Sequence, residues 1–419
     1  MTESANIGRE HLAQAGLEKL PANWNVVSLG DILCDDRGIS VGVMYPGDHD
    51  PEGVPLIKAG DMNGSIINPR PDFKISKAKH QEYRRTALEG GELLMTLVGD
   101  VGQCAVVPPK MAGWNTARAV AVMRLADPSD VHFVRQCLLS RPLRHLMDVW
   151  SNTTVQATLN LKEIRQLPLP WPPKRERDAI AEFGKSLDDK IELNRRMNAT
   201  LETITQAIYH SLTGVVSATE LPLGWRESTI GEEVRVVGGS TPSTTKPEFW
   251  EGGAHHWATP KDLSNLSSPV LLETERRITE AGLQEIGSGL LPAGTVLLSS
   301  RAPIGYLVIS EIPVAVNQGF IAMICDQTLP NYFVWLWTKN NIEAIKGRAN
   351  GTTFMEISKA NFRPLPVLVP PAPLLNEFKR QVEPLHSRMV SNQKESSALA
   401  ALRDTLLPEL LSGVLRIPE

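Results

Sequence analysis

The 419-residue sequence is poor in the residues that build metal clusters, disulfide frameworks and glycan-binding surfaces. It has only four cysteines, which lie far apart and form no CxxC pair: Cys34, Cys104, Cys137 and Cys325. This spacing excludes a cysteine-rich metal site and is typical of a chain kept in a reducing compartment. Aromatic residues make up 5% of the chain, which argues against a glycan-binding module.

Long apolar runs are also missing. No run approaches the ~18 residues that a membrane-spanning helix needs, and the polar start MTESANIGRE lacks the features of a signal peptide. We therefore expect a cytoplasmic protein that makes no contact with a membrane. The formal net charge of −4 excludes a protein held on nucleic acid by a global positive field, but the local potential facing the phosphates can still be positive.

Catalytic motifs are absent as well. The Pro-Pro pairs at 108, 172 and 370 do not belong to the Asp/Asn/Ser-Pro-Pro-aromatic tetrapeptide of amino-methyltransferases. Gly184-Lys185-Ser186 resembles the end of a phosphate-binding loop, but Ala179 stands where that motif requires its first glycine. The only histidine pair, His255-His256, has side chains on opposite faces if it lies on a strand. We expect no catalytic residue, no metal site and no bound cofactor.

An internal repeat of about 200 residues is the most informative feature that is present. Leu20-Pro21-Ala22-Asn23-Trp24 recurs 201 positions later as Leu221-Pro222-Leu223-Gly224-Trp225, and Leu29-Gly30-Asp31 recurs at the same offset as Ile230-Gly231-Glu232. Further pairs follow in the same order: 91–96 with 294–299, 167–170 with 365–368, and Pro172-Pro173 with Pro370-Pro371. An ordered series of this kind indicates a duplication.

Each copy has two physically different parts. The first, about 150 residues, contains short apolar runs such as 119–125 and 295–300 between Gly, Pro, Asn and Asp, which predicts a mixed α/β domain. The second, about 40 residues, has apolar residues three or four apart and ends at Gly214 or Gly413, which predicts one long helix. We expect an α+β fold with two pseudo-symmetric mixed α/β domains separated by an antiparallel coiled coil of two long helices, each roughly 60 Å long at 1.5 Å per residue. Two unrelated surface helices are the alternative.

Asn194 and Asn392 interrupt the two apolar stripes near the midpoint of each helix. Helices related by a pseudo-twofold axis run antiparallel, so their midpoints meet. We predict that these two asparagines face each other and fix the register of the coiled coil, a known use of a lone polar residue at such an interface. Solvated asparagines are the alternative.

The pattern as a whole resembles the specificity (S) subunits of type I restriction–modification enzymes. The resemblance rests on the paired Leu-Pro-x-x-Trp segments, the paired Leu-Pro segments at 167–170 and 365–368, the Thr-Thr pairs at 153–154 and 352–353, and the two long helices. It covers essentially the whole chain. It implies that each domain reads one half of a bipartite DNA sequence, and that the coiled coil sets the gap of unspecified base pairs.

The resemblance also implies a division of the chain and a set of partners. The segments are an N-terminal helical segment that closes a pseudo-twofold ring (1–20), target recognition domain 1 (21–173), a central helical region (174–214), target recognition domain 2 (215–371) and a distal helical region (372–419). The implied partners are double-stranded DNA, two modification (methyltransferase) subunits and restriction (translocase/nuclease) subunits. S-adenosylmethionine is expected on the modification subunits, and this chain is expected to be a non-catalytic subunit of the complex.

Cations and amides are the candidates for DNA contacts, because cations meet phosphates and side-chain hydrogen bonds read base edges. In the first domain these are Arg118 and a basic run made of Lys74, Lys77, Lys79, Arg84 and Arg85; a solvated helix face is the alternative for the run. In the second domain Arg301 suits a guanine edge, and Asn317 and Gln318 suit adenine. A phosphate contact or a structural salt bridge accounts for Arg301 equally well, and turn stabilisation accounts for the amides.

A duplicated module on a coiled-coil scaffold that binds protein or glycan instead of DNA is the alternative function. Binding of random-sequence duplex by the chain together with its modification partner separates the two.

Overall fold

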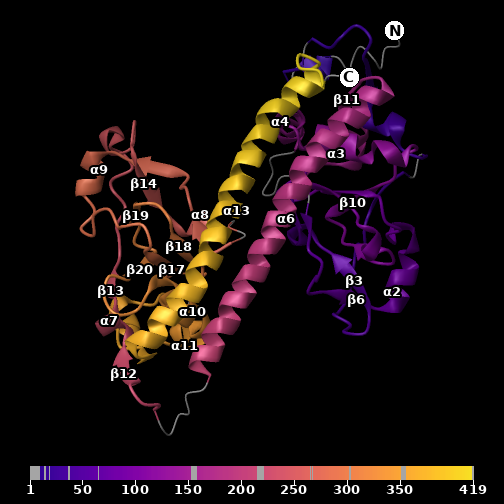
Figure 1. The fold of residues 1–419 in the computed structure, drawn as a ribbon. Coiled ribbons are helices and arrows are strands. Elements are labelled where there is room, and N and C mark those ends of the chain that lie inside the picture. Colours follow the sequence, from indigo (N-terminus) through magenta and orange to yellow (C-terminus); the bar gives the residue numbers. More distant parts are fainter. Residues whose placement is uncertain are drawn as a thin grey trace. The chain divides into compact units, whose positions relative to one another are not determined.

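The computed structural model describes residues 10–13, 16–17, 19–35, 38–64, 66–151, 158–214, 221–264, 266, 268–301, 303–350 and 355–417. The chain divides into two compact units (Figure 1). Unit 1 comprises Met1–Glu192 and Ala398–Glu419, and unit 2 comprises Leu193–Ser397. The division passes through both long helices, so each unit contains one globular part and about half of each helix.

Unit 1 is built around a four-stranded sheet of order β2-β10-β7-β8. The two central strands, β7 and β10, are buried along their whole length, as their apolar sequences require. In a second sheet β3 pairs antiparallel with β6 and parallel with β9, and elsewhere β1 pairs with β11 and β4 with β5. The strands are β1 Asn25–Ser28, β2 Ile39–Val41, β3 Val54–Ile57, β4 Met62–Asn63, β5 Ile66–Ile67, β6 Lys74–Ile75, β7 Leu93–Thr96, β8 Cys104–Val106, β9 Asn115–Thr116, β10 Val120–Met123 and β11 Pro168–Trp171.

Unit 2 repeats this topology. Its main sheet has the order β13-β20-β17-β18-β15, β14 pairs antiparallel with β16 and parallel with β19, and β12 pairs with β21. Every pairing of unit 1 except β4–β5 has a counterpart here, and β15 is an addition. The strands are β12 Arg226–Thr229, β13 Arg235–Val237, β14 His255–Ala258, β15 Val270–Leu271, β16 Arg276–Ile278, β17 Val296–Ser299, β18 Leu307–Ser310, β19 Val314–Val316, β20 Phe320–Ile324 and β21 Pro366–Val369.

Short helices follow the strands in each unit. Unit 1 contains α2 Lys77–Glu82, α3 Val131–Leu139, α4 Arg141–Trp150 and α5 Leu161–Gln166, with a 3₁₀ turn, η3, at Arg84–Thr86. Unit 2 contains α7 Ile230–Glu233, α8 Pro260–Ser264, α9 Glu280–Gln284, α10 Asn331–Asn340, α11 Ile342–Gly347 and α12 Lys359–Phe362. The further 3₁₀ turns are η1 Leu29–Ile32, η2 Ala59–Asp61, η4 Pro109–Met111 and η5 Pro128–Asp130 in unit 1, and η6 Pro247–Phe249 in unit 2.

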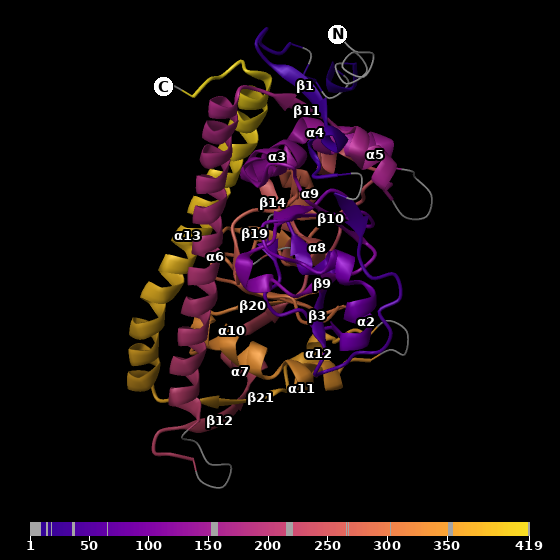
Figure 2. The same ribbon diagram turned by 90° about the vertical axis from the view of Figure 1, so that its right-hand side faces the viewer.

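The two long helices are α6 (Lys174–Thr213) and α13 (Ala372–Ser412). In both views the magenta α6 and the yellow α13 run side by side (Figures 1 and 2). In unit 1 the first half of α6 packs with the second half of α13, and in unit 2 the second half of α6 packs with the first half of α13. The pairing is therefore antiparallel within each unit, and the predicted fold class is confirmed.

The described part of the N-terminal segment, predicted to be helical over residues 1–20, is only partly helical. Residues 10–13 are helical, whereas 16–17 and 19–20 are not. Gly16 has a φ of 82°, and the Leu17 amide donates to the Leu12 carbonyl while the Gly16 amide donates to the Ala13 carbonyl. This is the Schellman arrangement that ends helices at a glycine. Leu12 and Leu17 are buried in one apolar cluster with Leu407 of α13.

Within the described residues, no helix combines the length and the apolar character that crossing a bilayer requires.

Candidate nucleic-acid interface

Three loops of unit 1 converge at the ends of its central strands. The Arg118 amide, between β9 and β10, donates to the Val43 carbonyl at 2.9 Å, and the Leu97 amide after β7 donates to the Ala119 carbonyl at 2.8 Å. A Cβ at Gly42 would lie 2.0 Å from the Thr116 carbonyl oxygen, so only glycine permits this approach. The loop cluster leaves Arg118 exposed.

The same three loops converge in unit 2. The Ser300 amide donates to the Gly319 carbonyl at 2.8 Å, and a Cβ at Gly239 would lie 1.6 Å from the Val316 carbonyl oxygen. Gln318 Oε1 accepts a hydrogen bond from Thr241 Oγ1 at 2.6 Å.

Equivalent backbone contacts give the correspondence between the two loop clusters. The strand order aligns Arg118 with Gln318, and the bridges Val98–Thr158 and Arg301–Glu356 align Val98 with Arg301. The backbone framework is repeated, while the side chains that it presents differ in charge and in hydrogen-bonding capacity.

The predicted basic run of unit 1 is only partly available for an external contact. Lys74 Nζ donates to the Pro51 carbonyl at 2.6 Å, and Lys79 pairs with Glu82 at 2.7 Å, a hydrogen bond that raises the pKa of Lys79. The others, Lys77 on α2 and Arg84 and Arg85 on η3, are exposed, and their side chains form no ion pair among the described residues.

Buried Asn115 holds this basic segment beside the Arg118 loop. Its Nδ2 donates to the Tyr83 carbonyl at 3.2 Å and its Oδ1 accepts from Thr86 Oγ1 at 2.8 Å. Asn115 is fully buried on β9, directly before the loop. The structure thus brings the α2–η3 segment and the loop cluster together. Sequence reasoning missed Asn115, because no motif marks it.

In unit 2 the predicted residues already have partners within the chain. Arg301 Nε lies 3.1 Å from Glu356 Oε1, and both side chains are about half exposed (48% and 45%). Asn317 Oδ1 accepts from the Gly319 amide at 2.9 Å, which stabilises the turn. Lys359 is a cation that the sequence did not single out: a Cβ on Gly238 would lie 3.2 Å from its Nζ. The Thr-Thr pairs at 153–154 and 352–353 lie outside the described residues.

Asn194 and Asn392 are both buried, which excludes solvated side chains. Asn194 Nδ2 donates to the Asn392 carbonyl at 3.4 Å and to Glu395 Oε2 at 2.8 Å. Asn392 Nδ2 donates to Asn198 Oδ1 at 2.8 Å, and Asn198 Nδ2 donates to the Met389 carbonyl at 3.2 Å. The structure thus brings the two asparagines together and adds Asn198, whose spacing of four residues from Asn194 places it on the same helix face. Their role in fixing register stays a prediction.

The described residues offer no metal-binding group of three or more His, Cys, Asp and Glu side chains. Burial raises the pKa of Cys104 and that of Cys325 each to about 12, which keeps both thiols protonated at neutral pH. The exposed groups of the loop clusters are suited to hydrogen bonding and charge pairing.

Comparisons with known proteins all identify the same family. The family model described as type I restriction modification DNA specificity domain matches residues 21–203 and again 222–383. The MjaIX specificity subunit of Methanocaldococcus jannaschii is 39% identical over 153 residues, which span 36% of this chain and only 35% of that subunit. The putative MjaX specificity subunit of the same organism is 19% identical over 97% of both chains. The crystal structure of an S subunit from M. genitalium has the same fold, with a TM-score of 0.54, 17% identity and coverage of 93% of this chain and 96% of that one.

Proposed function

The chain belongs to the type I restriction modification DNA specificity family, and on that premise we propose that it is the subunit that selects the DNA sequence on which its complex acts. Each recognition domain reads one half of a bipartite target in double-stranded DNA.

One observation carries this proposal: the loop cluster occurs twice on the same backbone framework, with different side chains at equivalent positions. Arg118 in unit 1 and Gln318 in unit 2 occupy equivalent positions, and so do Val98 and Arg301. An arginine suits the O6 and N7 acceptors of guanine, whereas a glutamine amide suits adenine. Two such clusters read an asymmetric pair of half-sites, while exposed cations such as Arg84 and Arg85 supply sequence-independent attraction to phosphates.

The long helices determine the gap between the half-sites in this proposal. α6 is one uninterrupted helix of 40 residues, about 60 Å long at 1.5 Å per residue. It runs through both units, so it is the covalent element that couples the two recognition domains.

We propose that catalysis is done by partners and not by this chain. Two modification subunits that carry S-adenosylmethionine methylate the DNA, and restriction subunits with translocase and nuclease activity join them; this chain holds no cofactor. The described residues provide no metal-binding group. The complex acts in the cytoplasm.

Selection from random-sequence duplex tests the function. The full chain, purified together with its modification subunits, is incubated with a random duplex pool, and the retained DNA is sequenced. The expected result is a motif of two short specified blocks separated by a fixed number of unspecified base pairs. A single contiguous motif, or no enrichment over the modification subunits alone, would contradict the proposal; the latter would favour a scaffold that binds another class of partner.

A further inference from the structure

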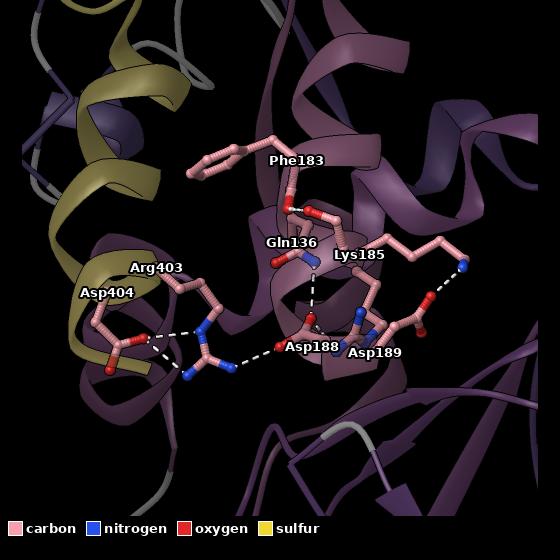
Figure 3. A network of polar contacts seen from close by, with 9 residues as sticks. Gln136, Phe183, Lys185, Asp188, Asp189, Arg403 and Asp404 are labelled. Carbon is pink, nitrogen blue, oxygen red and sulfur yellow. Dashed lines mark hydrogen bonds and ion pairs between the residues drawn. The ribbon is translucent and has the colours of Figure 1, made fainter. Parts of the chain in front are cut away.

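A buried ionic network joins the globular part of unit 1 to both long helices (Figure 3). Asp188 of α6 is only 7% exposed. Its Oδ2 accepts hydrogen bonds from the Arg135 guanidinium at 2.7 Å and from Gln136 Nε2 at 3.0 Å, both on α3. Its Oδ1 accepts from the Arg403 guanidinium of α13 at 2.7 Å. One carboxylate therefore connects three helices that are distant in sequence.

The network stays charged in spite of its burial. Burial by itself raises the pKa of Asp188, but Arg135, Gln136 and Arg403 together outweigh that effect and lower it below the ordinary value. Burial likewise opposes the charge on Arg403, yet the contacts with Asp188 and Asp404 raise the pKa of Arg403. Charge-assisted hydrogen bonds of this kind demand a defined geometry.

A glycine in α6 leaves room for the Gln136 side chain of α3. A Cβ at Gly184 would lie 2.4 Å from Gln136 Cδ, so any other residue would displace that side chain. Glycine in a helix interior costs up to about 1 kcal/mol relative to alanine. Gly184 lies one turn before Asp188. The room that it leaves for Gln136 beside the carboxylate explains why a glycine is present there.

The fold does not require the network, because unit 2 has the same topology without it. Phe133-Val134 of α3 corresponds to Phe333-Val334 of α10, and the next two residues in unit 2 are Trp335 and Leu336. Both are buried in an apolar cluster. Buried ion pairs are on average no more stabilising than well-packed apolar groups, so stability alone does not explain the one in unit 1.

We propose that Asp188 is a positioning residue for DNA recognition. By holding α3 to α6 and α13 in one orientation, it fixes recognition domain 1 on the helices and restricts the number of base pairs accepted between the two half-sites. This inference rests on the proposed function. One base pair changes the position of a half-site by about 3.4 Å and its direction by about 35°, so a small rotation of the domain changes which spacer fits.

The test measures spacer preference separately from affinity. Once the wild-type target is known, the full chain with its modification subunits is titrated against duplexes with the correct spacer, spacers one base pair longer or shorter, and single half-sites. The variants are D188N and R403Q; the latter removes only the α13 contact and leaves Asp188 paired with Arg135. The control is D189N, which removes the neighbouring exposed carboxylate that pairs with Lys185 on the helix surface (Figure 3).

D188N and R403Q should reduce the preference for the correct spacer by about tenfold, equivalent to about 1.4 kcal/mol, while each half-site keeps its sequence preference. D189N should leave the preference unchanged, and R403K, which keeps the positive charge, should restore most of it.

A fall in affinity that is equal for all spacers would overturn the inference, because it indicates a purely structural role. If D188N does not fold, the test rests on R403Q. An unchanged spacer preference in R403Q then overturns the inference. If the wild type shows no bipartite target, the proposed function fails as well. If the wild type and all variants prefer the same spacer equally strongly, only the role of Asp188 is overturned.

Discussion

The two units share their topology but differ in how the globular part meets the long helices. In unit 1, Arg135 and Gln136 of α3 bind the buried carboxylate of Asp188. In unit 2, the corresponding Trp335 and Leu336 of α10 belong to an apolar cluster that also contains Phe378 and Val382 of α13.

Unit 2 has polar contacts of its own at this junction. His386, which lies fourteen residues into α13 as Asp188 does into α6, contacts Glu311 Oε1 at 2.7 Å, and Glu311 is 27% exposed. Lys339 pairs with Glu202, and these side chains are 41% and 24% exposed. Both junctions are packed, but α10 contributes apolar side chains where α3 contributes Arg135 and Gln136. The two units therefore use different side chains at the junction between the globular part and the long helices.

The largest difference between the junctions should appear when each central polar residue is replaced. D188L should destabilise unit 1 by about 3–5 kcal/mol, because it leaves the Arg135 charge buried without its partner. H386L should cost unit 2 about 1 kcal/mol, since it removes one hydrogen bond and water reaches Glu311. Denaturant titration followed by hydrogen exchange of peptides from each unit measures both losses. Equal losses would show that the two junctions are energetically alike.

The matched control removes the entire network. R135L/Q136L/D188L/R403M replaces Asp188 and its three partners by apolar residues. Asp404 loses Arg403 but is 41% exposed, so no buried charge is left unpaired. Its stability should equal or exceed that of the wild type by up to about 4 kcal/mol. If this variant is as unstable as D188L, the loss in D188L comes from disturbed packing and not from the unpaired arginine.

The polar layer in the coiled coil should have the next largest effect, and only on unit 2. N392L leaves buried Asn198 Oδ1 without its donor and should cost about 1–3 kcal/mol. N194L/N198L/N392L removes all three side chains and should recover the loss, while allowing other registers. Thermal denaturation measures the stabilities, and cysteine cross-linking across the two helices reports register. A triple variant less stable than N392L would contradict this account.

The long helices and the duplicated domains could be predicted from the sequence because both leave periodic signals. Apolar spacing and the flanking Pro173 and Gly214 predict α6, and the helix occupies Lys174–Thr213. The asparagine layer was foreseen for Asn194 and Asn392, but Asn198 was not. Its partnership depends on which face of α13 it meets.

The Asp188 network left no readable signal in the sequence. Gly184-Lys185-Ser186 resembles the end of a phosphate-binding loop, and only the packing of α3 on α6 shows why Gly184 and Asp188 are present. The same holds for Arg301, whose ion pair with Glu356 depends on a loop distant in sequence. Local patterns predict elements, whereas pairings between distant segments require the three-dimensional structure.

Two exposed arginines of unit 1, Arg84 and Arg85, should contribute to DNA affinity through phosphate contacts that do not depend on sequence. R84A/R85A in unit 1 should weaken binding to all sequences by about tenfold, and should make the dependence of log affinity on log salt shallower by about 0.9 per lost phosphate contact. K74A is the control, because Lys74 Nζ is engaged with the Pro51 carbonyl and its loss should change little. Titrations at several salt concentrations measure both. An unchanged affinity of R84A/R85A at low salt would reject the phosphate assignment.

The smallest effect expected is an acid sensitivity that belongs to the junction of unit 1. Because the folded-state pKa of Asp188 is lowered, its contribution to stability is complete above the unfolded pKa of about 3.9 and is lost as the pH falls below that value.

His132, on the same helix as Arg135, has a pKa lowered by burial and by Arg135, so its contribution is lost earlier, as the pH falls below about 6.5. Arg403 belongs to the network, and Lys185, Asp189 and Asp404 surround it. The stability of the wild type relative to the apolar quadruple variant should therefore decline chiefly below pH 4. Denaturant titration of both full chains at pH 6.5, 5, 4 and 3, followed by hydrogen exchange of peptides from unit 1, measures this decline. If the wild type instead loses stability relative to this variant mainly between pH 6.5 and 5, the imidazole of His132 controls the junction and the carboxylate does not.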